Sequence, residues 1–142
     1  MVRLFIISMS LIYALVAKGQ EIPPSISKKL LDLPGTYKGR LPCADCSGIE
    51  TSLTLQCDSL CDHGKYMRID KYLNTKNGDQ TNKIKGWWGF VNNKNNTIVI
   101  ALDINDSTKM SFYEVTKKGD LSPIDKNLQS TDAQGDLALK KL

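Results

Sequence analysis

Hydrophobic and polar residues alternate along much of the chain from Gly35 onward. In the segment 49–56 the apolar side chains Ile49, Leu53 and Leu55 are separated by polar ones. Such alternation places each set on its own face of an extended strand, so this segment is predicted to be a strand with one buried face. The same pattern predicts about eight strands in all, at 35–41, 49–56, 66–73, 83–91, 97–104, 110–116, 120–124 and 137–142.

The segments between these strands carry turn residues. Asn77 with Gly78 and the asparagine-rich run 92–96 are the clearest examples. No strand is followed by a long amphipathic helix, so an antiparallel barrel or sandwich is favoured over parallel β-α-β units. Closure of about eight strands removes exposed edges and leaves an interior that side chains or one small ligand fill. We therefore predict one all-β domain, a small antiparallel β-barrel, over residues 35–142.

Two adjacent tryptophans fall within one predicted strand. Neighbouring side chains in a strand point to opposite faces, so Trp87 and Trp88 are expected to lie on opposite sides of the sheet. One is then a core residue and the other a surface residue. Gly86 and Gly89 flank the pair and allow a close approach or a bend there.

The first 19 residues have the pattern of a secretory signal peptide. Arg3 gives a positive start, an apolar run follows over 4–16, and Ala17 and Gly19 are the small residues required before cleavage at Gln20. The run is shorter than the ~20 apolar residues of a membrane span, so an uncleaved anchor is the less favoured alternative. No cysteine lies near the cleavage site, so no lipid anchor is expected. The mature protein is predicted to be exported to an oxidising compartment, either the periplasm or the medium.

Residues 20–34 are predicted to be an exposed lead-in before the barrel. This segment contains Pro23 and Pro24 and several polar residues. Within it, residues 27–33 are expected to form one short helix, with Ser27 as its cap and Pro34 as its end.

Composition and charge narrow the class of partner. Hydrophobic residues make up 41% of the chain and charged residues 24%, which is ordinary for a packed globular domain. Loss of Arg3 and Lys18 with the signal peptide leaves 17 basic against 15 acidic residues, a net charge of +2. This charge is too small to indicate binding to nucleic acid or to an anionic membrane surface.

Four cysteines form two clusters, Cys43 with Cys46 and Cys57 with Cys61. In an exported protein they are expected to form disulfides, and pairing within each cluster requires the least rearrangement of the chain. The pair Cys57 and Cys61 would then staple the loop between two strands. Because these loops are short, each disulfide stabilises less than the ~3 kcal/mol expected for a 15-residue loop.

Reduced cysteines would instead bind a soft metal ion. Thiolates select copper(I) or zinc, and His63 is close enough in sequence to complete a site. However, a strand of eight residues at roughly 3.3 Å each separates the two clusters by about 26 Å, so a four-cysteine zinc site is disfavoured. A two-thiolate site made by Cys43 and Cys46 alone remains open.

Catalytic patterns are weak, and the chain is predicted not to be an enzyme. The C-x-x-C pair lacks the helix and the β-α-β context of thiol oxidoreductases. His63 is the sole histidine and lies in a turn beside Asp62 and Gly64, where it is expected to be solvated. No nucleophile elbow or phosphate-binding glycine loop occurs.

The loop around the first cysteine pair carries a specific motif. Residues 41–49 read L-P-C-A-D-C-S-G-I, and the surrounding stretch 35–55 resembles the amino-terminal domain of the NlpE family. These are bacterial outer-membrane lipoproteins linked to copper tolerance and envelope-stress signalling. The resemblance extends over roughly residues 33–142 and implies a small lipocalin-like antiparallel barrel. It also implies that Cys43 and Cys46 are the copper-responsive element.

Other residues of the motif are predicted to shape the loop. Pro42 fixes the backbone after Leu41 as the strand ends, Asp45 can accept bonds from nearby backbone N–H groups, and Gly48 is expected to adopt a positive φ.

Two functional hypotheses follow. In the first, the protein is an exported binding or sensing module, linked to copper homeostasis or envelope stress, with copper(I) as the leading ligand of Cys43 and Cys46. In the second, it is a disulfide-stabilised barrel that binds a small apolar ligand or an envelope protein partner without any metal.

Overall fold

The computed structural model describes residues 31–57, 61–91, 97–131 and 136–142. The predicted signal peptide and residues 20–30 of the lead-in lie outside these ranges, as does most of the predicted helix; Leu31 is helical and Asp32 forms a turn. The described strands are β1 (Gly35–Leu41), β2 (Gly48–Leu55), β3 (His63–Thr75), β4 (Gly78–Val91), β5 (Val99–Leu102), β6 (Ser111–Val115), β7 (Leu121–Ile124) and β8 (Lys140–Lys141). No helix within these ranges is long and apolar enough to cross a membrane.

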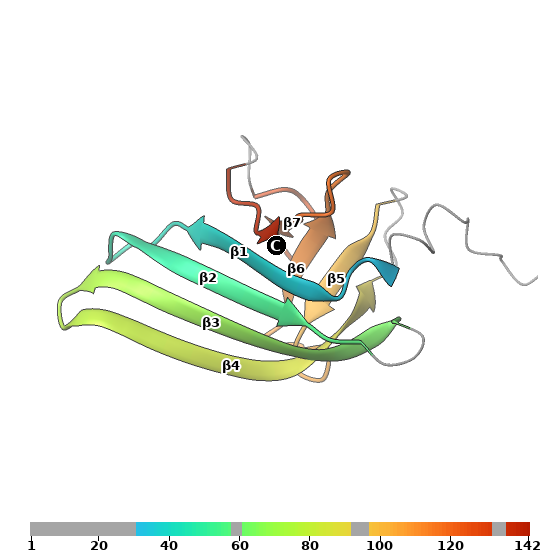
Figure 1. The fold of residues 1–142 in the computed structure, drawn as a ribbon, viewed down its shortest axis with the longest axis horizontal. Coiled ribbons are helices and arrows are strands. Elements are labelled where there is room, and N and C mark those ends of the chain that lie inside the picture. The colour runs from blue at the N-terminus through green and yellow to red at the C-terminus, as the bar shows by residue number, and fades with distance from the viewer. Residues whose placement is uncertain (1–30, 58–60, 92–96, 132–135) are drawn as a thin grey trace, which may run out of the picture.

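All strands belong to one antiparallel sheet that follows chain order. The order is β7-β6-β5-β4-β3-β2-β1-β8, so only β8 leaves the meander, and it pairs with β1. Leu139, just before β8, exchanges two backbone hydrogen bonds with Leu121 of β7, with N···O distances of 3.0 and 2.8 Å. The C-terminal segment thus joins both ends of the sheet into a nearly closed barrel (Figure 1). The predicted all-β barrel is confirmed.

The barrel interior is filled by the apolar side chains that the alternation placed on one face. Tyr37, Leu53, Trp88 and Ile100 are completely buried. Trp88 donates its indole N–H to the Gln56 carbonyl at 2.8 Å. The side chain of Trp87 is exposed on the outer face of the sheet. The expectation that the two tryptophans lie on opposite faces is confirmed.

The β3–β4 hairpin is longer than the sequence pattern predicts. The strands reach the turn at 76–77 instead of ending at residue 73 and beginning at residue 83. Gly78 adopts a φ of +83°, and Thr75 hydrogen-bonds across the turn to the Gly78 carbonyl. The run 74–82 is almost wholly polar, so it shows no hydrophobic alternation. Backbone pairing with β3 and the local turn hold it extended.

Other strands are shorter than predicted. β5 ends at Leu102 because Asp103 takes a φ of +58° and accepts a turn hydrogen bond from Asp106 N–H. The closing strand consists of Lys140 and Lys141 only, with Leu139 bridging to the opposite edge.

The first four strands extend well beyond the others. β5 pairs only with Trp88–Val91 of β4. The other end of β1–β4, which carries the β1–β2 and β3–β4 turns, therefore projects away from β5–β7 (Figure 1). We call this the hairpin end.

Candidate functional site

The motif cysteines lie in the loop between β1 and β2, at the hairpin end. Cys43 and Cys46 form a disulfide whose Cα atoms are 5.3 Å apart. Both side chains are partly exposed, and Pro42 and Asp45 are exposed beside them. Leu41 precedes the loop and packs against the hydrophobic core. The loop thus presents its sulfur atoms at the rim of the barrel while its base is anchored inside.

Hydrogen bonds fix the far side of this loop. The Arg40 guanidinium donates to the Ser47 carbonyl at 2.8 Å, and Ser47 N–H donates to the Leu73 carbonyl of β3 at 2.9 Å. The Asn74 amide donates to the Ser47 hydroxyl at 3.0 Å. Gly48 follows with a φ of +146°, as predicted, and the Arg40 side chain occupies the space where a Cβ would lie.

A cavity of about 460 Å³ separates the disulfide loop from the β3–β4 turn. Its walls include Cys43, Asp45 and Cys46 on one side and Tyr72, Lys76 and Gln80 on the other. Tyr72 and Gln80 are register partners across β3 and β4. The wall opposite the cysteines therefore exists because the hairpin is long, which the sequence pattern did not reveal. We call this cavity the cysteine pocket.

The second cysteine pair lies at the opposite end of β2. Cys57 and Cys61 form a disulfide across the β2–β3 loop, with Cα atoms 4.7 Å apart, and Cys61 is buried. His63 is 47% exposed and lies 2.6 Å from the Asp62 carboxylate. Because β2 separates the loops (Figure 1), the two pairs do not converge, as the strand length predicted.

Whether Cys43 and Cys46 can hold a soft metal ion depends on their oxidation state. In the disulfide neither sulfur is a thiolate. Within the described ranges no group of three or more His, Cys, Asp or Glu side chains is placed to hold a metal ion. Reduction would free two thiols on one loop. That donor set suits two-coordinate copper(I) and falls short of the four ligands of a structural zinc site.

Comparison with known proteins decides the family. The chain matches the model of the NlpE N-terminal domain over residues 37–134. It belongs to the NlpE N-terminal domain family. It is 27% identical to lipoprotein NlpE of Escherichia coli K12 over 124 residues, which cover 87% of this chain and 48% of that protein. The chain thus spans about half the length of this curated relative.

Two solved structures are similar to this NlpE-type chain. A putative lipoprotein from Shewanella oneidensis has 31% identity and a TM-score of 0.56, covering 78% of this chain and 89% of that one. The Cpx pathway activator NlpE of Escherichia coli has 27% identity and a TM-score of 0.48, covering 71% of this chain and 46% of that one. The family resemblance of the L-P-C-A-D-C motif is confirmed.

The NlpE-type barrel also contains a buried ionic network that sequence reasoning missed. Asp70 is 1% exposed; one carboxylate oxygen accepts from Thr51 Oγ1 and the other from Arg68 Nε, both at 2.7 Å. Burial raises the pKa of Tyr113, and the positive charge of Arg68 acts in the opposite direction. Strand alternation places Arg68 and Asp70 on the same face of β3 as Tyr66 and Tyr72. This shared face was the feature of the sequence that could have indicated their burial.

Buried tyrosines make the stability of this barrel sensitive to alkaline pH. Burial raises the pKa of Tyr37 to about 12, helped by the charges of Asp120 and Asp32, and burial also raises that of Tyr66. A group with a raised folded-state pKa keeps its full contribution below its unfolded pKa of about 10 and loses it as the pH rises through the folded value.

We therefore expect the contribution of these tyrosines to the free energy of unfolding to be level up to about pH 10 and to fall by at most about 1.4 kcal/mol per pH unit for each tyrosine towards pH 12. Urea denaturation at a series of pH values measures this, with Tyr37→Phe as the control. That variant should show a shallower fall. An equal slope in both proteins would contradict the assignment to Tyr37.

Proposed function

We propose that this chain is an exported binding and sensing domain of the bacterial envelope, with the Cys43–Cys46 pair as its responsive element. The observation that carries the proposal is the position of that disulfide, which is partly exposed at the wall of a cavity. Membership of the NlpE N-terminal domain family supports an envelope role. The curated relative, lipoprotein NlpE of Escherichia coli, supports the link to envelope stress that the resemblance of the cysteine motif implies.

The proposed switch is the reduction of this disulfide. Two electrons and two protons from a dithiol reductant convert the S–S bond into two thiols, and the reductant becomes a disulfide. Copper(I) then displaces the thiol protons and binds the two sulfur atoms, which are soft ligands. Asp45 and Lys76, which carry opposite charges, both line the same cavity. After reduction by the dithiol the proposed switch requires only binding of the ion, so the domain is proposed to act without catalysing a reaction of a substrate.

A copper(I) titration of the mature chain, reduced and kept free of oxygen, tests this function. We expect one copper(I) to bind, and we expect the variant Cys43→Ser/Cys46→Ser to bind at least about a hundredfold more weakly because both soft ligands are lost. Cys57→Ser/Cys61→Ser is the matched control and should bind like the parent. Tight binding by the first variant would reject the assignment, and circular dichroism establishes that both variants fold.

The second candidate is a disulfide-stabilised barrel that binds a small apolar ligand or a protein partner without metal. The pairing of all four cysteines into two disulfides favours it. Tyr72 and the disulfide supply apolar surface to the cysteine pocket. A reduced chain that binds no copper(I), together with an oxidised chain that binds a ligand in that pocket, would support this candidate instead.

A further inference from the structure

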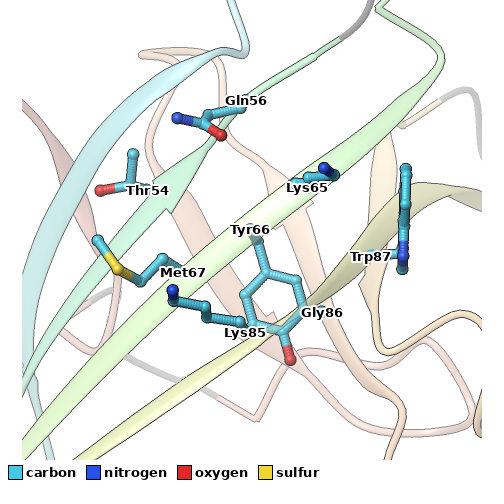
Figure 2. A pocket seen from close by; sticks show the side chains of 8 residues that line it. All are labelled: Thr54, Gln56, Lys65, Tyr66, Met67, Lys85, Gly86 and Trp87. Carbon is cyan, nitrogen blue, oxygen red and sulfur yellow. The ribbon is translucent and has the colours of Figure 1, made fainter.

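A second cavity lies on the outer face of the sheet, across β2, β3 and β4, away from the hairpin end. It has a volume of about 520 Å³, and its walls include Gln56, Lys65, Met67, Lys85 and Trp87. Figure 2 shows Lys65 and Trp87 at one side of this cavity and Met67 and Lys85 at the other. We call it the outer groove. It combines the apolar side chains of Met67 and Trp87 with the ammonium groups of Lys65 and Lys85.

Trp87 is the main apolar feature of the outer groove. Its side chain is 42% exposed, and the Lys65 ammonium lies 5.6 Å from the centre of its ring. The two residues are register partners across β3 and β4, as are Met67 and Lys85. An exposed tryptophan beside paired lysines suits a ligand that is both apolar and anionic.

Positive charge dominates the outer face beyond the groove. Alternation and register place six basic side chains on the outward positions of β1–β4: Lys38, Arg40, Lys65, Lys71, Lys83 and Lys85. The acidic residues on these outward positions are Glu50 and Asp79, and Asp79 is 3.0 Å from the Lys71 ammonium. The charge of this face therefore favours an acidic partner.

The same region contains an unpaired strand edge. β5 covers β4 only from Trp88 onward, so no described strand pairs with that edge between Gly78 and Trp87. The Trp87 carbonyl accepts a hydrogen bond from Ile104 N–H at 3.3 Å, which shows that its backbone points to this edge. Because direction alternates along a strand, the backbones of Lys83 and Lys85 point to the edge as well. In Figure 1 this part of β4 forms the free margin of the sheet.

We propose that the β4 edge and the outer groove together bind an extended, acidic segment of a partner polypeptide, which adds to the sheet as a further strand. The partner's main chain pairs with Lys83 and Lys85. The partner's carboxylates face the ammonium groups of Lys65 and Lys85 in the outer groove. One of its apolar side chains enters the groove beside Trp87. Strand addition of this kind takes its affinity from main-chain hydrogen bonds and its specificity from pockets for alternate side chains.

Charge and backbone chemistry select this occupant over two others. A second copy of the chain joined edge to edge would bring lysines against lysines, which is the way that natural sheets resist self-pairing. An anionic lipid surface would meet the lysines but would leave the edge N–H and C=O groups without strand partners. The inference is independent of the copper(I) proposal, because it uses neither cysteine pair.

The probe for the test is an acetylated, amidated peptide of sequence Thr-Glu-Thr-Glu-Thr-Leu-Thr, titrated into the mature chain. Its glutamates and leucine share one face in an extended conformation. We expect saturable binding that changes the fluorescence of Trp87 and slows the exchange of the Lys83 and Lys85 amide hydrogens. A peptide with its edge-facing amides N-methylated should bind at least about tenfold more weakly.

Charge reversal provides the matched variants. Lys83→Glu/Lys85→Glu should weaken binding of the peptide by about tenfold or more, whereas Lys38→Glu, on the same face but on β1, should change it less than about twofold. The proposal would be overturned if the N-methylated peptide bound as tightly as the unmodified one, or if both variants lost the same amount of peptide affinity. It would also be overturned if the chain did not bind the peptide but dimerised, or bound phosphatidylglycerol vesicles, through Lys83 and Lys85.

Discussion

Replacing Trp88 by alanine is expected to lower the free energy of unfolding by about 3–5 kcal/mol, the range seen when a buried tryptophan or phenylalanine is truncated in a core. Trp88 is 0% exposed and contacts Phe90 edge to face, with ring centres 5.6 Å apart. Its loss also removes the indole donor from the Gln56 carbonyl at 2.8 Å. Urea denaturation followed by circular dichroism measures the effect.

The neighbouring tryptophan is the matched control. Trp87 is 42% exposed on the outer face, so Trp87→Ala should change the unfolding free energy by less than about 1 kcal/mol. The same amino acid is removed in both variants, one position apart, so the difference isolates burial. Equal destabilisation by the two substitutions would show that the inside and outside of β4 are wrongly assigned.

The second large effect is expected at the buried carboxylate. Asp70→Ala should destabilise the barrel by about 3–5 kcal/mol, because the Arg68 guanidinium would keep its charge in a largely buried site without its partner. Thr51 would also lose the acceptor that its hydroxyl reaches at 2.7 Å. Thermal and urea denaturation both report the change.

Two further variants distinguish the effect of breaking the buried ion pair from the effect of removing any carboxylate. Asp79→Ala removes a carboxylate from an exposed pair with Lys71 and should have little effect, because solvent screens it. Arg68→Met/Asp70→Leu replaces both charges by apolar groups and should recover much of the lost stability. A double variant less stable than Asp70→Ala alone would contradict the idea that an unpaired charge causes the loss.

The fold was predictable from the sequence because each half-buried strand keeps a period of two. Ile49, Leu53 and Leu55 show this on β2, where prediction and structure differ by one residue at each end. The polar run 74–82 has no such period, so its strand residues were not predicted. Its strands are held by backbone pairing and by the turn at Gly78, neither of which leaves a hydrophobic pattern.

The candidate site was predictable only in part. Short spacing along the chain favoured the pairing of Cys43 with Cys46, and Gly48 was recognised as a position that needs a positive φ. The facing wall of the cysteine pocket was not foreseen, because Tyr72 and Gln80 reach it only through the long hairpin. Disulfide and metal ligation use the same thiols, so residue spacing alone does not separate them.

The buried network and the β4 edge were missed for a different reason. Arg68 and Asp70 are two residues apart in a strand, a spacing that is common on solvated faces. Their burial depends on the strands that close over them. The free edge of β4 depends on β5 being short, and the positive φ at Asp103 that ends β5 leaves little signal in the sequence.

The most direct test of whether Cys43 and Cys46 form the responsive site is a thiol assay. It measures which of the four cysteines react with a thiol reagent before and after copper(I) is added. In protein isolated without reductant we expect no reactive thiol. After mild treatment with dithiothreitol, Cys43 and Cys46 should react with an alkylating reagent, and one equivalent of copper(I) should block both without affecting Cys57 or Cys61. Full reactivity of Cys43 and Cys46 in the presence of copper(I) would contradict the proposed function.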